Sequence, residues 1–250
     1  MSRREFFTMP RRPPKKPNPS LNLSGHLLSL ESLPVPLDPA ILFPRQANVE
    51  LEIGCGKGLF LSTASTAVPE RNFLGAEIVV GYARLCAGKL AQSQSTNARI
   101  IHGDALFLVR SMLCDACLVG IHVYFPDPWW KARHRKRRVL SEAFLDHAGR
   151  VLRMGGQLHI WTDVEDYFQE SILAVAATGL FSKPRDEPPS PASHDLDYRT
   201  HFDRRTRLAG EPVWRAVLDR NQAPPRGPRE HHPQSLSSTD SRATSADRFD

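Results

Sequence analysis

A turn at residues 125–131, with the sequence FPDPWWK, carries the most chemical information in this chain of 250 residues. Its two prolines fix their own φ angles and lack backbone donors, so the segment forms a stiff turn rather than the middle of a helix or strand. The carboxylate of Asp127 stands there among the rings of Phe125, Trp129 and Trp130. A rigid acid between flat apolar faces suits a nucleobase, which offers a face for stacking and an edge for hydrogen bonds.

A dense run of cationic side chains comes directly after that acid. Its members are Lys131, Arg133, Arg135, Lys136, Arg137 and Arg138. Such a run matches a phosphate backbone, and the net charge of +6 also favours a polyanionic partner. Two alternatives stay open. The run also fits the solvated start of a helix, or a nuclear import signal, although the latter leaves the FPDPWW segment unexplained.

A glycine-rich turn with acids around it forms a second group. The sequence LEIGCGKG at 51–58 alternates glycines, which let the chain turn tightly and let a ligand approach the backbone. Glu52 lies inside an apolar run and needs a cation to offset its burial. Glu77 ends the next apolar run, where a carboxylate can accept ribose hydroxyls. Asp104 ends the third, where an acid can accept from an adenine amino group or cap a helix.

The spacing of the glycines indicates the ligand. Gly54, Gly56 and Gly58 follow the pattern GxGxG rather than GxGxxG, and an acid precedes the turn. S-adenosylmethionine carries a sulfonium and an ammonium group, whereas a dinucleotide carries an anionic pyrophosphate. The sequence therefore predicts S-adenosylmethionine as cofactor, with a dinucleotide-dependent oxidoreductase as the weaker alternative.

Apolar patterns of two periods predict the elements that position these residues. Strands buried on both faces are expected at 47–53, 72–78, 98–102, 118–125 and 157–162. Helical periodicity lies between them, at 59–68, 79–92, 105–113, 139–152 and 164–178. Alternating units of this kind predict an α/β fold with a doubly wound, mostly parallel sheet. Two runs with period two, at 200–207 and 212–218, predict an antiparallel closing hairpin at the sheet edge.

Composition divides the chain into three parts. Residues 1–44 are basic and rich in proline and predict an N-terminal arm with room for a short helix near 27–33. Residues 45–220 form the predicted domain. Residues 221–250 hold few apolar groups and predict a disordered tail, because such a segment cannot offset its chain entropy.

The cysteines and the apolar runs indicate the setting of the protein. Four cysteines are too few for a disulfide scaffold, and the pair Cys114 and Cys117 has no second pair or histidine cluster to complete a metal site. These features predict structural thiols and no metal. No apolar run reaches the length of a membrane span, and the N-terminus lacks the apolar core of a signal peptide. We therefore expect a cytoplasmic protein without a membrane segment.

The motifs LEIGCGKG, FLGAEI, HGDA, FPDPWWKARHRKRR, GGQLHIWTD and THFDRR…GEPVW follow one another in this order. Over about residues 47–218 the sequence resembles the bacterial tRNA (guanine-N7-)-methyltransferases, the TrmB family. The resemblance implies a class I S-adenosylmethionine-dependent methyltransferase fold, Rossmann-like, with a seven-stranded sheet whose last strand is antiparallel. It also implies that the methyl group goes to N7 of the guanine at position forty-six, in the variable loop of tRNA.

The resemblance assigns roles to the matching positions. It implies that Asp127 is the catalytic acid. The cofactor site would contain Glu52, Gly54, Gly56, Gly58, Glu77, Asp104 and Asp127. The substrate would meet Lys131, Asp163, Thr200, His201, Phe202 and Asp203, and the basic run from Arg133 to Arg138 would hold the RNA backbone. As an alternative, Asp163 could be a plain cap for the helix expected from Val164.

Three departures from the family pattern stand out. Asp203 replaces a glutamate, Trp130 stands where histidine is common, and Cys55 fills a slot that is often aromatic. None of them removes a residue that the chemistry needs. Two other function classes stay open: a methyltransferase for a small molecule or protein, which has no need of the basic run, and a non-catalytic RNA-binding module. The oligomeric state, monomer or homodimer, is open too.

Overall fold

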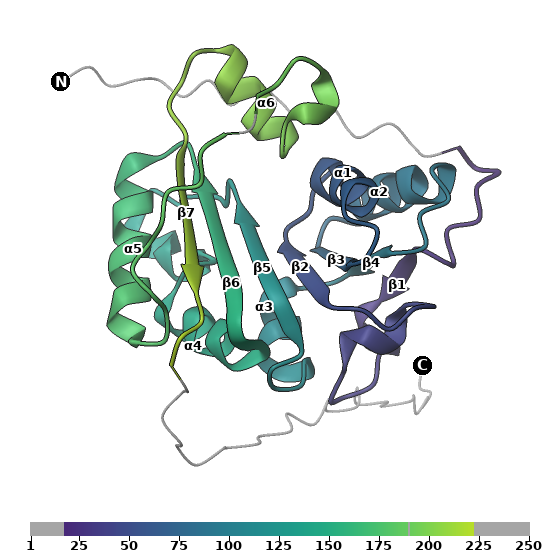
Figure 1. Ribbon diagram of the computed structural model, residues 1–250, viewed down its shortest axis with the longest axis horizontal. Helices are drawn as coiled ribbons and strands as arrows, with labels where there is room; N and C mark the ends of the chain where they lie inside the picture. Colours follow the sequence, from purple (N-terminus) through teal and green to yellow (C-terminus); the bar gives the residue numbers. More distant parts are fainter. Residues whose placement is uncertain (1–17, 190, 223–250) are drawn as a thin grey trace, which may run out of the picture.

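A single twisted sheet organises the chain. The computed structural model describes residues 18–189 and 191–222, and in this part of the chain seven strands pair in the order β1-β4-β3-β2-β5-β6-β7 (Figure 1). The strands are β1 (Leu27–Ser29), β2 (Val49–Ile53), β3 (Asn72–Glu77), β4 (Ala98–His102), β5 (Leu118–Tyr124), β6 (Leu152–Thr162) and β7 (Trp214–Asp219). All pairs are parallel except β6 with β7. The predicted fold class is confirmed.

Helices cover both faces of this sheet. The α-helices are α1 (Leu59–Ala67), α2 (Val80–Gln92), α3 (Ala105–Phe107), α4 (Glu142–Val151), α5 (Glu165–Thr178) and α6 (His201–Leu208). Shorter helical turns are η1 (Leu30–Ser32), η2 (Pro39–Leu42), η3 (Leu108–Met112), η4 (Ala132–Arg137) and η5 (Asp195–Asp197). One apolar cluster joins α1 and α2 to the sheet, and a second joins η3, α4 and α5 to it. Figure 1 shows α6 beyond the end of the sheet where β5 and β6 finish.

The central strand β2 shows how the sequence separates core from chemistry. All five of its residues are buried, as expected for a strand covered on both faces. Leu51 pairs with Ile121 of β5, which in turn pairs with Leu158 of β6, and these three side chains belong to the cluster with α4 and α5. Because side chains alternate along a strand, Glu50 and Glu52 face the side of α1 and α2. The acids of β2 therefore lie on one face of the sheet.

The segment 200–207 differs from the prediction. It forms helix α6 rather than a strand, so among the described residues the closing strand β7 pairs with β6 and, on its other edge, makes only an isolated antiparallel bridge from Val217 to Arg185. Thr200 caps the helix by accepting a hydrogen bond from the backbone of Asp203 at 3.0 Å, and Gly210 follows with a φ of +68°. The alternating residues that favoured a strand are also compatible with a short helix that buries Asp203 and Thr206. The capping pattern at Thr200 is the signal that the period-two interpretation missed.

The described part of the predicted arm is more ordered than an extended tail. Within 27–33, where a short helix was expected, Leu27–Ser29 forms β1 and pairs with β4 at the edge of the sheet, and a short 3-10 helix, η1, follows at Leu30–Ser32. Leu30, Leu37 and Phe43 are buried against the apolar core. A strand of three residues has too little alternation to be read from the sequence. Residues 1–17 and 223–250, with most of the predicted arm and tail, lie outside the described residues.

Two predicted elements have an irregular form. The helix expected at 105–113 consists of α3 and a turn of π-helix, η3. Gly155, with a φ of +75°, lies inside β6 where its register with β5 shifts, rather than in a connection before the strand. Glycine at this point permits the bulge.

Candidate active site

A cleft of about 630 Å³ opens at the carboxyl ends of the strands. Parallel strands bring their carboxyl ends to one edge, which is where open α/β sheets bind ligands. The cleft is lined by residues 53–59, 77–79, 124–127 and 200–202, together with Tyr82, Trp129, Val139 and Arg205. The glycine-rich turn, Asp127 and most of the predicted substrate segment thus share one cavity. Glu52 and Asp104 lie outside its lining.

The glycine-rich turn has the backbone that its sequence predicts. Gly54, Gly56 and Gly58 have φ angles of +70°, +53° and +68°, a region that other residues rarely adopt. A Cβ atom added at Gly58 would lie 1.9 Å from Sγ of Cys86 in α2. Gly58 is therefore required both by its φ angle and by close packing, whereas Cβ atoms at Gly54 and Gly56 would meet nothing within 4 Å.

Glu77 braces that turn. One carboxylate oxygen accepts from the backbone N–H of Gly56 at 2.9 Å, and the other accepts from Val79 at 2.7 Å. A carboxylate offers about four lone pairs, so Glu77 retains capacity to accept from a ligand as well. The glycine turn after β2 and the end of β3 are thereby tied together before any ligand binds.

Glu52 is a buried acid whose carboxyl group, within the described part of the chain, lacks a partner for one of its oxygens. Its side chain is buried, and Oε2 has no hydrogen-bond partner among the residues described. Burial raises the pKa of Glu52 well above its ordinary value, the charges of Cys86 and Glu77 add to that rise, and Arg199 opposes it. A buried acid with an unpaired oxygen beside a ligand cleft fits a cationic group. The residues present therefore suit the sulfonium and ammonium groups of S-adenosylmethionine.

The turn that carries Asp127 is fixed by hydrogen bonds at both of its ends and has a strained backbone. The backbone N–H of Phe125 donates to the carbonyl of Trp161 at 2.7 Å, and Nε of Arg138 donates to the carbonyl of Pro128 at 2.7 Å. Phe125 and Trp129 have φ angles of +49° and +44°, which are uncommon for residues with a side chain. Asp127 is exposed, lines the cleft, and has no hydrogen-bond partner among the residues described. Its carboxylate is free to accept from a ligand.

The predicted substrate segment enters the cleft through α6. Thr200, His201 and Phe202 line the cavity. Asp203, the departure from the usual glutamate, is fully buried instead. Its oxygens accept from the backbone of Arg199 at 3.1 Å and from the guanidinium of Arg215 at 3.2 Å. In this arrangement Asp203 anchors the segment, and the other residues face the cleft.

The basic run forms η4 beside the cleft, and its members differ in availability. Lys131, Arg133, Lys136 and Arg137 are exposed, and Arg137 lies over the ring of Trp129 at 5.2 Å. Arg138 is different, because it bonds Pro128 and forms an ion pair with Glu170. The side chain of Arg135 lies outside the described part of the structure. The exposed members are placed to meet an anion, whereas Arg138 supports the turn.

Comparison with known proteins identifies the family. A family model described as "Putative methyltransferase" matches residues 46–216. A tRNA (guanine-N(7)-)-methyltransferase of Rhodopirellula baltica is 45% identical over 218 residues, which cover 85% of this chain and 80% of that protein. The chain belongs to this methyltransferase family. The protein of the same name from Sodalis glossinidius is 39% identical over 183 residues, covering 72% and 75% of the two chains.

A solved structure supports the methyltransferase fold. The 16S rRNA methyltransferase KamB superposes with a TM-score of 0.52 at 17% identity, over 70% of this chain and 88% of that one. An identity this low bears on the fold alone. Family membership confirms the resemblance inferred from the motifs.

The structure shows which of two acids caps a helix. Asp104 caps α3, because its Oδ1 accepts from the backbone of Leu106 at 2.8 Å and of Phe107 at 3.4 Å. Asp163 does not cap α5: the cap position is Val164, which makes no side-chain cap and donates its N–H to Thr162 instead. The alternative of a plain helix cap therefore fails for Asp163.

Arg199, which sequence patterns did not single out, lies close to the site without lining the cleft. Arg199 lies over the rings of Phe60, Tyr124 and Trp161 at 5.5, 6.0 and 5.4 Å. It also pairs with Glu187 at 3.1 Å. No local signal marks such a residue, because its partners come from four separate segments.

Among the described residues, no group of three metal-ligating side chains occurs, and no helix has both the length and the apolar character of a membrane span.

Proposed function

We propose that this protein transfers a methyl group from S-adenosylmethionine to N7 of a guanine in tRNA. We infer that the guanine is the one at position forty-six of the variable loop. The observation that carries the proposal is the shared cleft, in which the glycine-rich turn, Asp127 and the start of α6 line one cavity. The names of the relatives support the choice of tRNA, and the exposed cations of η4 are consistent with it.

The cofactor would lie along the strand ends. When bound, S-adenosylmethionine supplies an electrophilic methyl group on a sulfonium. The backbone of the turn at Gly54–Gly58 would lie close against the cofactor. Glu77 would accept from the ribose hydroxyls, and Asp104 from the adenine amino group. Glu52 would offset the positive end of the cofactor. These roles follow from the chemistry of the donors, since carboxylates accept from hydroxyl and amino groups.

The transfer itself makes few demands on acid–base chemistry. N7 of guanine has a lone pair and carries no proton, so attack needs no strong general base. The rate then depends on alignment of the acceptor with the methyl group and on electrostatics. Asp127 would accept from N1–H and the exocyclic amine of the guanine and so orient the base. Stabilising the cationic product is its second role.

The remaining residues would hold the RNA. Lys131 and Asp163 would contact the substrate with Thr200, His201 and Phe202, while the cations from Arg133 to Arg137 would contact phosphates. Trp129 or Trp130 would stack on the base. The target base must leave its stack in folded tRNA, at a cost of a few kcal/mol.

We further infer the organisation of the whole chain. Residues 45–220 would carry the catalytic residues, residues 1–44 would be a basic segment whose described part supports the sheet through β1, and 221–250 would be a tail. The protein would act in the cytoplasm as a monomer or homodimer. Size-exclusion chromatography with light scattering distinguishes these two states.

The test uses the full chain, S-adenosylmethionine labelled in its methyl group, and an unmodified tRNA transcript. We expect label in the RNA and strand cleavage at one guanine under conditions specific for 7-methylguanosine. A transcript with adenine at position forty-six is the control and should remain unlabelled. Label in that control would contradict the position, and no label in any tRNA would contradict the function. Free guanosine and a denatured protein mixture, offered in parallel, test the small-molecule and protein alternatives.

A further inference from the structure

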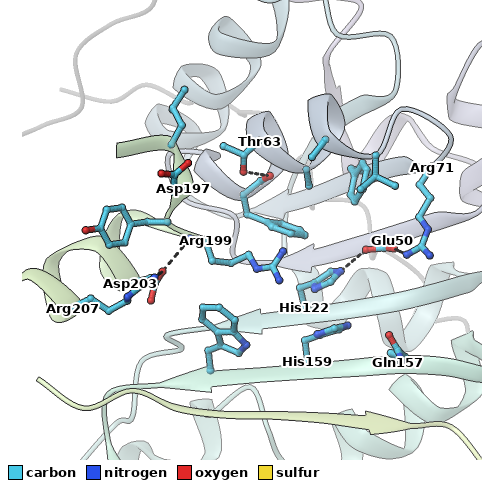
Figure 2. A pocket seen from close by; sticks show the side chains of 18 residues that line it. Glu50, Thr63, Arg71, His122, Gln157, His159, Asp197, Arg199, Asp203 and Arg207 are labelled. Carbon is cyan, nitrogen blue, oxygen red and sulfur yellow. Dashed lines mark hydrogen bonds and ion pairs between the residues drawn. The ribbon is translucent and has the colours of Figure 1, made fainter. Parts of the chain in front are cut away.

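A second cavity lies behind the active-site cleft. Its volume is about 350 Å³, and it lies between α1, the faces of β5 and β6, and the segment before α6. Figure 2 shows Glu50, His122 and His159 side by side on its floor, with Arg199 reaching in from the opposite side. Tyr124 lines the active-site cleft, and its hydroxyl bonds His122 on the floor of this second cavity. The tyrosine therefore connects the two sites.

The floor of that cavity is a continuous chain of hydrogen bonds. Arg71 forms an ion pair with Glu50, whose Oε2 lies 2.7 Å from Nε2 of His122. Nδ1 of His122 lies 2.8 Å from the hydroxyl of Tyr124. Glu50, His122 and Tyr124 are each less than a tenth exposed, so the chain runs from the surface at Arg71 to the back of the cleft through buried side chains. A fully satisfied polar network in such surroundings holds its members in one arrangement.

The protonation states follow from the surroundings. Burial lowers the pKa of His122 to about 4, the charge of His159 acts in the same direction, and the bond to Glu50 opposes both. Burial acts to raise the pKa of Glu50, but His122 and Arg71 outweigh it and lower the value to about 2. At neutral pH an ionised Glu50 therefore accepts from Nε2–H of a neutral His122. Nδ1 is then the acceptor for the hydroxyl of Tyr124.

The other charges around the cavity have partners of their own. Glu187 accepts from Arg199 at 3.1 Å and lies 3.2 Å from Nδ1 of His159. His159 stacks on His122 with ring centroids 4.5 Å apart. These groups are therefore paired with one another, as Glu50 is with Arg71 and His122.

Tyr124 connects the hydrogen-bonded chain to the turn that carries Asp127. It is the last residue of β5, and its ring makes edge contacts with Phe60 and Trp161 at 5.3 and 5.2 Å. The next residue, Phe125, has the strained φ of +49° that begins the turn to Asp127. A strained backbone persists only where its surroundings over-determine it.

We propose that Glu50, His122 and Tyr124 are positioning residues that fix the turn carrying Asp127. This inference rests on the proposed function, in which Asp127 orients the guanine. The chain acts through the fixed hydroxyl and ring of Tyr124, and none of the three residues needs to touch the substrate.

The first test is Tyr124→Phe, which removes the hydroxyl and keeps the ring. We expect kcat for tRNA methylation to fall roughly tenfold, the usual scale for one lost buried hydrogen bond. KM for tRNA and for S-adenosylmethionine should change by less than about twofold, because their contacts are retained. The matched control is Ser171→Ala, which removes a buried hydroxyl that donates to the carbonyl of Tyr167 at 2.7 Å in α5. That control should lower Tm by a similar amount and leave kcat unchanged.

The second test changes Glu50, the residue at the opposite end of the hydrogen-bonded chain from Tyr124. Glu50→Gln keeps an acceptor for His122 but removes the charge, and we expect a lower kcat with unchanged KM. Residues that act as one chain give non-additive effects, so the double variant with Tyr124→Phe should lose little more than the worse single variant. Effects that multiply would overturn the proposal. If Tyr124→Phe does not fold, Glu50→Gln decides alone, and wild-type kcat in that variant would overturn it too.

The third test is independent of activity. Imidazole nitrogen chemical shifts of the labelled protein should show His122 as the neutral Nε2–H tautomer, with an Nδ1 signal that moves in Tyr124→Phe. An Nδ1–H tautomer would overturn the proposed chain. Wild-type protein without methyl transfer would contradict the proposed function and leave this spectroscopic result to be judged separately. Active wild-type protein with an equally active Tyr124→Phe variant would contradict only the positioning role.

Discussion

Phe125 stacks on Phe202, with ring centroids 6.0 Å apart and ring planes 21° from parallel. Phe125 begins the turn that carries Asp127, and Phe202 lies in the first turn of α6. The contact joins the end of β5 to a helix that starts more than seventy residues later in the sequence. The guanidinium of Arg205 also contacts this pair, 4.6 Å from the ring centroid of Phe202. The proposed catalytic acid and the proposed substrate segment therefore form one packed unit.

Replacing the acid of that unit should stop the chemistry and spare binding. We expect Asp127→Ala to lower the rate of methyl transfer by at least about 100-fold, because an oriented carboxylate is lost from the reacting base. Affinity for tRNA, measured by filter binding, should stay within about threefold of wild type. Asp146→Ala, an exposed acid in α4, is the control for general loss of negative charge. Normal turnover of Asp127→Ala would remove this residue from the mechanism.

The buried acid Glu52 should make stability depend on pH. Its pKa is raised in the folded protein, so the folded state holds a proton that the unfolded state releases above about pH 4.5. The free energy of unfolding of the cofactor-free protein should therefore fall as pH rises from about 5 to 8. Glu52→Gln should remove much of this fall, as measured by urea denaturation at several pH values. Identical slopes in both proteins would show that Glu52 is ionised without a cofactor.

The same substitution should weaken cofactor binding. A glutamine cannot offset the positive groups of S-adenosylmethionine, so we expect Kd to rise by about 10- to 100-fold. Calorimetry in buffers of different ionisation enthalpy should also show that wild-type protein releases protons on binding and that Glu52→Gln does not. Equal proton release by the two proteins would separate Glu52 from the cofactor.

The exposed cations of η4 should set the salt dependence of tRNA binding. Alanine at both Arg133 and Lys136 should reduce the slope of log K against log salt by about 2, one for each lost phosphate contact. The control replaces Arg153 and Lys183, exposed cations near the amino end of β6, and so has the same net charge. An unchanged slope in the first variant would reassign the run to a solvated surface.

Gly58 should be the least replaceable glycine of the turn. Gly58→Ala combines an unfavourable φ with a Cβ that would lie 1.9 Å from Sγ of Cys86, and we expect a loss of about 2–4 kcal/mol in unfolding free energy. Gly179→Ala is the control, since its φ is +65° with nothing within 4 Å, and it should cost only about 1 kcal/mol. Adding Cys86→Ala should recover part of the larger loss. Equal losses for the two glycines would show that the contact with Cys86 relaxes easily.

Local sequence patterns were sufficient for the parallel core. The strands β2 to β5 were predicted to within a few residues, because each is an apolar run bounded by turns. The turn at Gly54–Gly58 was equally readable, since a positive φ restricts the choice of residue. The resemblance to the methyltransferase family implies that the turn and Asp127 share one site, and both line the same cleft.

Contacts between distant segments could not be predicted in this way. The chain from Glu50 to Tyr124 joins two strands through side chains, and no spacing in the sequence marks it. Segment 200–207 was assigned to a strand because its residues alternate, although Thr200 provides a helix cap. The burial of Asp203 depends on Arg215 in β7 and was equally hidden. Such features depend on the tertiary fold rather than on local preference.

The two hydrogen bonds that Glu77 accepts from the backbone of Gly56 and Val79 have a consequence for how the cofactor binds. A loop already held in its final shape loses little conformational entropy when a small molecule arrives. Association should then be fast and nearly rigid, with no slow rearrangement of the loop to limit it. Glu77→Asp would shorten the side chain and break these hydrogen bonds. Cofactor binding would then become a two-step process, in which the loop must order before the complex forms.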